Sequence, residues 1–250
     1  MIMKLGLVLA GGGSRGAYEI GVYRALKELN IEFDIVTGTS VGAINMFMIV
    51  QHDFEELTKV WENITFEGVM NHKFKWKNKG LEVLLKAPLH GGFKTEPLRD
   101  VINNHYCAEK IRCSNIKGGL VYTTKGRKYN ALKLDDISDE DIPKFVLISS
   151  SAKPFLKPIV RNGVQCYDGY YSDNVPLKLA LDMGADKCIC IDIMKGFRQK
   201  CDESKAIYIK PTKKLQFFLD FDHKYIEKNF ELGYEDTMKM KDKILKFIQE

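Results

Sequence analysis

Two glycine-rich turns near the start of the chain each join a short apolar run to an apolar helical pattern. Residues 5–10 and 33–36 have the bounded apolar composition of buried strands, and residues 17–29 and 41–50 carry apolar side chains at helical spacing. Strands joined by a helical crossover run in the same direction, and the crossover is right-handed. This strand–helix–strand–helix opening therefore predicts a parallel sheet.

The rest of the chain predicts further elements of the same kind. A hairpin is expected over residues 158–167, because Asn162-Gly163 supplies the positive φ angles of a tight turn. Thr95 is the expected N-cap of a helix with proline in its first turn. Other helices are predicted at 54–64, 175–183 and 222–250, and strands at 120–124, 129–134, 187–193 and 206–209. We expect one domain, residues 1–250, with a three-layer α/β fold: a mainly parallel central sheet and helices on both faces.

The composition is that of an ordinary globular protein. Of the 250 residues, 45% are apolar and 28% charged, which excludes a disordered, fibrous or multi-span membrane protein. None of the six cysteines forms a C-x-x-C pair or a zinc-finger spacing with histidine, so we expect no metal and no cofactor. The run at 5–10 is too short to span a bilayer or to serve as a signal peptide. We expect a cytoplasmic protein that also makes peripheral contact with membranes.

The net charge of +5 is concentrated in one segment. Between Asn71 and Lys94 there are six lysines and a single acid, Glu82, and aromatic residues lie among the lysines. Such a segment suits an anionic lipid surface or single-stranded nucleic acid, whereas the simplest alternative is a solvated loop packed by its own aromatics. We expect a lipid surface and no nucleic acid, with residues 66–94 as a mobile, membrane-facing lid. The expected contact residues are Lys73, Phe74, Lys75, Trp76, Lys77 and Lys79.

The first glycine turn, residues 11–16, reads Gly-Gly-Gly-Ser-Arg-Gly and matches G-x-G-x-x-G. In dinucleotide-binding proteins this turn holds a pyrophosphate, and an acid at the end of the second strand holds the ribose. Here the second strand ends in Val36-Thr37-Gly38-Thr39-Ser40 without an acid, and Asp34 lies at its other end. The sequence therefore argues against a nicotinamide or flavin cofactor.

The second glycine turn, residues 38–42, reads Gly-Thr-Ser-Val-Gly and matches the G-x-S-x-G nucleophile elbow. The elbow holds its serine at strained dihedral angles that expose the hydroxyl, and the flanking glycines keep strand and helix from colliding. Ser40 is therefore the candidate nucleophile. A glycine-rich turn in which Ser40 only caps the helix is the structural alternative.

An acyl-transfer serine also needs amide donors for the oxyanion and a base for its proton. The backbone of Gly11, Gly12 and Gly13 is the candidate oxyanion loop, and Arg15 adds positive charge at the helix start. The residues alone leave the base open. His223 satisfies the chain order of a Ser-Asp-His triad, whereas Asp168-Gly169 follows the predicted hairpin and is otherwise a turn dipeptide.

Taken together, these motifs resemble the patatin-like phospholipases. The resemblance rests on the motifs at 11–16, 38–42 and 168–169 and on Ser-Ser-Ser-Ala-Lys-Pro at 149–154, and it spans about residues 5–195. It implies a Ser–Asp dyad without histidine, with Ser40 as nucleophile, Asp168 as proton acceptor and residues 11–13 as the oxyanion loop. The residues given a supporting role are Arg15, Gly16, Gly38, Gly42 and Gly169.

The sequence departs from the family pattern at one position. The family usually has glycine or alanine after Asp-Gly, and this chain has Tyr170. The expected function is hydrolysis of lipid acyl esters, of the phospholipase A type, through an acyl-enzyme. The alternatives are a Ser-His-Asp esterase or thioesterase on the same elbow, and a non-catalytic lipid-binding module.

Overall fold

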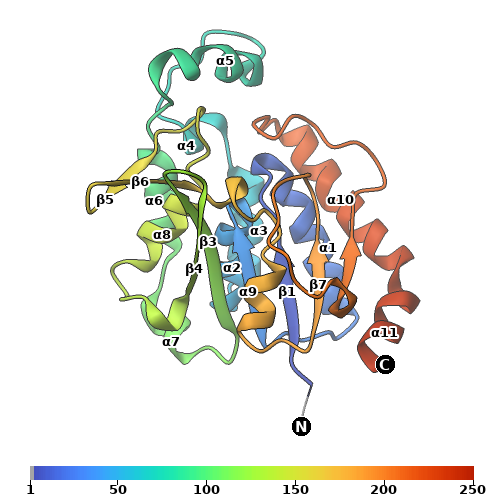
Figure 1. Ribbon diagram of the computed structural model, residues 1–250. Coiled ribbons are helices and arrows are strands. Elements are labelled where there is room, and N and C mark those ends of the chain that lie inside the picture. Colours follow the sequence, from blue (N-terminus) through green and yellow to red (C-terminus); the bar gives the residue numbers. More distant parts are fainter. Residues whose placement is uncertain (1–2) are drawn as a thin grey trace.

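The computed structural model describes residues 3–250 and contains one sheet of eight strands (Figure 1). The strands lie in the order β5-β6-β3-β2-β1-β7-β8, with β4 also paired to β3. Neighbours from β3 to β8 are parallel, and β4, β5 and β6 are antiparallel additions, which confirms the predicted mainly parallel sheet. The strands are β1 Leu5–Leu9, β2 Ile35–Thr39, β3 Lys117–Thr124, β4 Lys128–Lys133, β5 Ile159–Arg161, β6 Val164–Asp168, β7 Lys187–Ile191 and β8 Ala206–Ile209.

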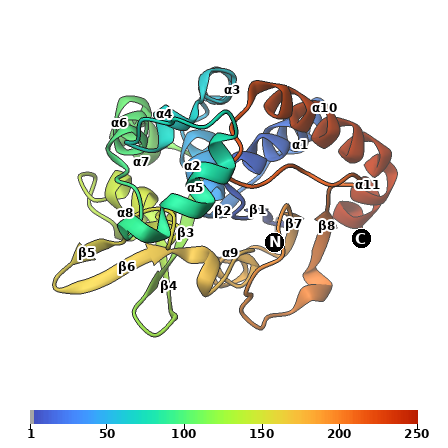
Figure 2. The ribbon, with the colours of Figure 1, turned by 90° about the horizontal axis from the view of Figure 1, so that it is seen from above.

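Helices cover both faces of this sheet, as the view from above shows (Figure 2). They are α1 Gly16–Glu28, α2 Val41–Val50, α3 Phe54–Asn63, α4 Phe66–Val69, α5 Lys79–Lys86, α6 Glu96–His105, α7 Ala108–Cys113, α8 Ile142–Ser149, α9 Leu177–Asp182, α10 His223–Lys239 and α11 Lys241–Gln249. Successive residues of a strand face opposite sides. Accordingly Gly118 of β3 lies against Met46 of α2, and Gly119 lies against Leu179 of α9. No helix within residues 3–250 combines the length and the apolar character needed to cross a membrane.

Strand β3 is longer than β2 and continues past its end. Thr39, the last residue of β2, pairs with Val121, and β6 then pairs with the next residues of β3, Asp168 lying opposite Tyr122. Since β4 occupies the other edge of β3 over this stretch, β2 and β6 share one edge, end to end. The residue that follows β2, Ser40, therefore meets the last residue of β6.

The C-terminal segment differs from the single helix predicted over 222–250. It forms α10 and α11, which are separated at Met240. No glycine or proline stands at this break. Helix α11 instead turns back on the domain, where Ile244 is fully buried and the Phe247 carbonyl accepts a hydrogen bond from Lys187 Nζ. Tertiary contacts thus override a continuous helical pattern.

Helices α1 and α10 approach each other closely through glycine. A Cβ at Gly233 would lie 2.2 Å from the Tyr18 carbonyl oxygen, and one at Gly21 would lie 2.0 Å from the Phe230 carbonyl oxygen. The contact is backbone against backbone, so no flexible side chain is available to move aside. The two helices can pack at this distance only while both positions lack a side chain.

We predict that Gly233→Ala lowers the free energy of unfolding by about 1–3 kcal/mol, because the added methyl group forces the two helices apart. Gly80→Ala is the matched control: Gly80 is also helical, but its Cβ would lie 3.5 Å from the nearest atom, an ordinary contact. There the gain in helix propensity should leave stability equal or slightly higher. Denaturant unfolding of the three proteins measures the difference, and equal midpoints for all three would contradict the packing argument.

Candidate active site

Ser40 lies on a strained turn between β2 and α2. Its φ of +56° is in the left-handed region that residues with a side chain rarely adopt. A Cβ at Gly38 would lie 2.1 Å from the Gly42 carbonyl oxygen, and one at Gly42 would lie 2.5 Å from the Leu9 carbonyl oxygen. The two glycines therefore permit the tight turn for the reason that the G-x-S-x-G pattern predicts.

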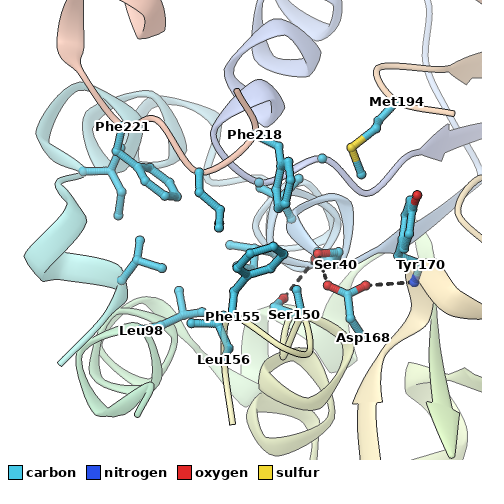
Figure 3. A pocket seen from close by; sticks show the side chains of 18 of the residues that line it. Ser40, Leu98, Ser150, Phe155, Leu156, Asp168, Tyr170, Met194, Phe218 and Phe221 are labelled. Carbon is cyan, nitrogen blue, oxygen red and sulfur yellow. Dashed lines mark hydrogen bonds between the residues drawn. The ribbon is translucent and has the colours of Figure 1, made fainter. Parts of the chain in front are cut away.

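The hydroxyl of Ser40 is hydrogen-bonded to a carboxylate. Ser40 Oγ donates to Asp168 Oδ2 at 2.6 Å, and the Tyr170 N–H donates to Asp168 Oδ1 at 2.8 Å (Figure 3). Asp168 is only 1% exposed and Ser40 only 8% exposed. A Cβ at Gly169 would lie 2.4 Å from the Val121 carbonyl oxygen, so the turn after Asp168 can lie this close to β3 only with glycine there.

Burial sets the protonation behaviour of Asp168. Loss of solvation raises the pKa of Asp168 to about 7, although the hydrogen bonds from Ser40 and the Tyr170 N–H act in the opposite direction. A carboxylate with a pKa near neutrality is a far better proton acceptor than one at the ordinary value of about 4. The pair therefore has the arrangement of a nucleophile and its base.

Two further serines hold the elbow in place. The Ser40 N–H donates to Ser149 Oγ at 2.9 Å, and Ser149 Oγ in turn donates to the Val121 carbonyl at 2.7 Å. Ser150 Oγ lies 3.0 Å from the Ser40 carbonyl oxygen, to which it donates. The serine run at 149–151 is part of the family resemblance, but its sequence alone predicts no role for it. The run begins at Ser149, the last residue of α8, directly after the apolar residues 145–148, and three successive hydroxyl residues at that point are the signal in the sequence.

The glycine loop differs in part from expectation. Gly12 and Gly13 line the pocket beside Ser40, and their N–H groups have no acceptor within residues 3–250. The Gly11 N–H instead donates to Asn174, to its carbonyl at 3.2 Å and to its Oδ1 at 3.0 Å, and Gly11 does not line the pocket. Of the three glycines, Gly12 and Gly13 therefore remain the candidate oxyanion donors.

The other two supporting residues of this turn have packing roles. Arg15 Nε donates to the Gln216 carbonyl at 2.8 Å, so the guanidinium anchors the segment before α10. Burial lowers the pKa of Arg15. A Cβ at Gly16 would lie 2.6 Å from Val41 and 2.8 Å from Trp61, so this glycine lets α1 approach α2.

Ser40 opens into an apolar cavity of about 300 Å³. Figure 3 shows the labelled apolar side chains Phe155, Leu156, Leu98 and Phe221 together on one side of the serine. On the other side stand Asp168, Tyr170 and Met194. An apolar cavity with a few convergent polar groups is typical of a site for a small or chain-like apolar ligand.

No histidine lines the cavity within the described residues. None of the five histidines, all of which lie within residues 3–250, hydrogen-bonds to Ser40 or Asp168. His223, the histidine that a triad would use, begins α10. Within residues 3–250 no cluster of His, Cys, Asp and Glu has the arrangement of a metal site.

The fold and the G-x-S-x-G elbow together define an α/β protein that carries a serine on a strand-to-helix turn, with a carboxylate beside that serine. The chain belongs to the patatin-like phospholipase family, whose model matches residues 7–181.

The curated relatives are much longer than this chain. Patatin-like phospholipase domain-containing protein 7 of Mus musculus is 26% identical over 202 residues, which cover 79% of this chain and 14% of that protein. Lysophospholipase NTE1 of Phaeosphaeria nodorum is 28% identical over 205 residues, which cover 76% of this chain and 12% of that protein. The chain thus spans about an eighth of the length of the curated relatives that it matches.

Solved structures show the same fold at low sequence identity. VipD from Legionella pneumophila superimposes with a TM-score of 0.57 and 14% identity, over 97% of this chain and 67% of that chain. The type III effector protein ExoU superimposes with a TM-score of 0.52 and 14% identity, over 94% of this chain and 52% of that chain. These likenesses are evidence of the fold alone.

The raised pKa of Asp168 predicts a pH-dependent difference in stability. The folded-state pKa of about 7 lies above the unfolded value of about 4, so between these pH values the carboxyl group is protonated only in the folded protein. The free energy of unfolding therefore falls as pH rises from about 4 to about 7. Asp168→Asn removes this loss. We expect the stability of Asp168→Asn relative to wild type to increase by about 2–4 kcal/mol between pH 5 and pH 8.

Denaturant unfolding of both proteins at the two pH values measures this increase. The comparison cancels the contribution of Asp173, a second buried aspartate whose pKa burial raises to about 7. A difference that stays constant with pH would mean that Asp168 has an ordinary pKa.

Proposed function

We propose that this chain hydrolyses acyl esters of lipids through a Ser40–Asp168 dyad. The observation that carries the proposal is the 2.6 Å hydrogen bond from Ser40 Oγ to a buried carboxylate, at the opening of an apolar cavity. Family membership over residues 7–181 supports a phospholipase-type substrate. The apolar walls supply the surface that an acyl chain needs to leave water.

The proposed reaction begins when Ser40 Oγ bonds to the ester carbonyl carbon and Asp168 accepts its proton. The carbonyl oxygen becomes negatively charged and accepts hydrogen bonds from the Gly12 and Gly13 N–H groups. The carbon–oxygen bond to the alcohol then breaks, and the alcohol leaves with the proton from Asp168. Water attacks the acyl-enzyme, Asp168 accepts the proton of the water and returns it to Ser40, and the fatty acid is released.

The test combines active-site labelling with substitutions. A fluorophosphonate probe should label Ser40 in the wild type, and Ser40→Ala should abolish both labelling and turnover of a soluble ester. Asp168→Asn should fold but lose at least about 1,000-fold in kcat, because both residues serve one proton transfer. Wild-type activity should rise with pH through about 7, since Asp168 accepts a proton only when ionised.

His223→Ala is the control for the triad alternative, because His223 lies outside the cavity. It should keep the activity and the acid limb of the wild type. Loss of the limb in any histidine variant, or substantial turnover by Asp168→Asn, would contradict the dyad. An unlabelled Ser40 would favour the non-catalytic lipid-binding alternative.

We further propose that residues 66–94 contact an anionic membrane through a surface that differs in part from the predicted one. Phe74 is half-buried against Phe66, and Lys79 pairs with Glu67 at 2.6 Å, so neither side chain is free to contact a membrane. Lys73, Lys75, Trp76 and Lys77 are exposed. Helix α5 and the turn after it add an exposed apolar row, Leu81, Leu84, Leu85 and Leu89.

Helix α5 stands above the carboxyl ends of the parallel strands, the same side as Ser40, and projects from the rest of the domain (Figure 1). Its Gly80 packs beside Phe217 and the Leu219 carbonyl, and Leu219 also lines the cavity. Exposed leucines lie beside Lys73, Lys75 and Lys77, which form no ion pair with any residue that the structure describes. This combination matches the two attractions of an anionic bilayer, apolar burial and surface potential. Docking here would place the membrane near the opening of the cavity.

Vesicle co-sedimentation tests this contact. Leu85→Ser with Leu89→Ser, and separately Lys73, Lys75 and Lys77 changed to Ser, should each weaken binding to anionic vesicles. Each lysine is expected to contribute about 1 kcal/mol, or about fivefold in the partition coefficient, at low salt. Val160→Ser with Val164→Ser is the control, since these valines are 63% and 45% exposed on the β5–β6 hairpin, outside residues 66–94, against 51% and 81% for Leu85 and Leu89. Equal loss in the control, or no loss in either variant, would contradict docking through α5.

A further inference from the structure

Tyr170, the residue that departs from the family pattern, forms part of the cavity wall. Its backbone N–H donates a hydrogen bond to Asp168 Oδ1. Its ring packs edge-on against the Tyr171 ring, with the two centroids 5.3 Å apart. On another side the ring meets the backbone of Gly196, where a Cβ would lie 2.8 Å from Tyr170 Cε2. The absence of a side chain at Gly196 is thus what makes room for the tyrosine.

The hydroxyl of Tyr170 is an isolated polar group in an apolar site. It makes no hydrogen bond to any atom of residues 3–250, and the ring that carries it is held by its neighbours. The Tyr171 hydroxyl, by contrast, donates a hydrogen bond to the Lys153 carbonyl oxygen. The ring stands on the Asp168 side of the site and its hydroxyl points away from Ser40 (Figure 3). A hydroxyl without a partner among the described residues is available to a part of the ligand that lies away from the reacting carbonyl.

The position of the proton donor decides which part of an ester lies against Tyr170. This step rests on the proposed function, in which Asp168 returns a proton to the leaving oxygen. The alcohol must therefore lie on the Asp168 side of Ser40, because proton transfer needs hydrogen-bond contact. Tyr170 and Met194 stand on that side, and Phe155, Leu156 and Leu98 stand on the other, where the acyl chain has room (Figure 3).

We propose that Tyr170 is a specificity-determining residue that narrows the alcohol side of the site and selects lipids with a single acyl chain. A lipid with one chain presents a small polar alcohol to Tyr170 and Met194. A diacyl lipid presents an alcohol that still carries a second long chain, which would have to pass the side chains of Tyr170 and Met194. The hydroxyl of Tyr170 donates a hydrogen bond to an oxygen of the alcohol portion.

The experiment compares a monoacyl and a diacyl phosphatidylcholine with the same acyl chain, both in detergent mixed micelles. Tyr170→Gly and Tyr170→Ala should raise the diacyl-to-monoacyl ratio of kcat/KM by about tenfold, because they remove the ring but keep the N–H that holds Asp168. Tyr170→Phe should keep the wild-type ratio and raise KM for the monoacyl lipid by about fivefold, since it loses only the hydrogen bond. Met194→Ala should shift the ratio in the same direction as Tyr170→Gly.

Leu98→Phe is the matched control on the acyl side. It should change the preferred acyl-chain length and leave the diacyl-to-monoacyl ratio as in wild type. An unchanged ratio in both Tyr170→Gly and Tyr170→Ala, with Ser40 still labelled by the fluorophosphonate, would overturn this proposal alone. Failure of the wild type itself to be labelled would overturn the proposed function, so the two failures are distinguishable.

Discussion

The hydrogen bond between Ser40 and Asp168 depends on one structural constraint, the shared edge of β3. The two residues are 128 positions apart in sequence, and they meet because β2 ends on this edge where β6 begins. The extra length of β3 is therefore what brings the two side chains together. Ser149 links the Ser40 N–H to the Val121 carbonyl of the same strand, so the Ser40–Asp168 pair and its support are built on one backbone segment.

The site concentrates unfavourable features that the rest of the fold must offset. A positive φ at a serine costs about 1–3 kcal/mol, and a buried carboxyl group is costly to ionise. Both features suit the proposed roles of the pair: the turn presents the hydroxyl, and burial brings the pKa of Asp168 to about 7. A large apolar core surrounds the parallel strands and provides the stability that permits them.

The segment around α5 is organised by a buried acid in addition to the apolar contacts of Val83, Ala87 and Phe93. Glu82 is fully buried and accepts hydrogen bonds from Lys86 Nζ at 2.6 Å and from the Lys75 and Trp76 N–H groups. Burial alone would raise the pKa of Glu82, but these hydrogen bonds, led by that from Lys86, lower it to about 2. The one acid among six lysines is thus the centre on which the segment folds, and the leucines remain outside for another surface.

The sequence by itself determined the features that rest on local physics. Strand–helix order follows from apolar periodicity, the Asn162-Gly163 turn from positive φ, and the Ser40 elbow from glycines at fixed spacing. Only the tertiary structure decided which groups meet. From the residues alone, the base stayed open between Asp168 and His223, and the glycine amides could not be told apart. These outcomes depend on contacts across more than a hundred residues, such as that of Gly11 with Asn174, which periodicity and spacing do not encode.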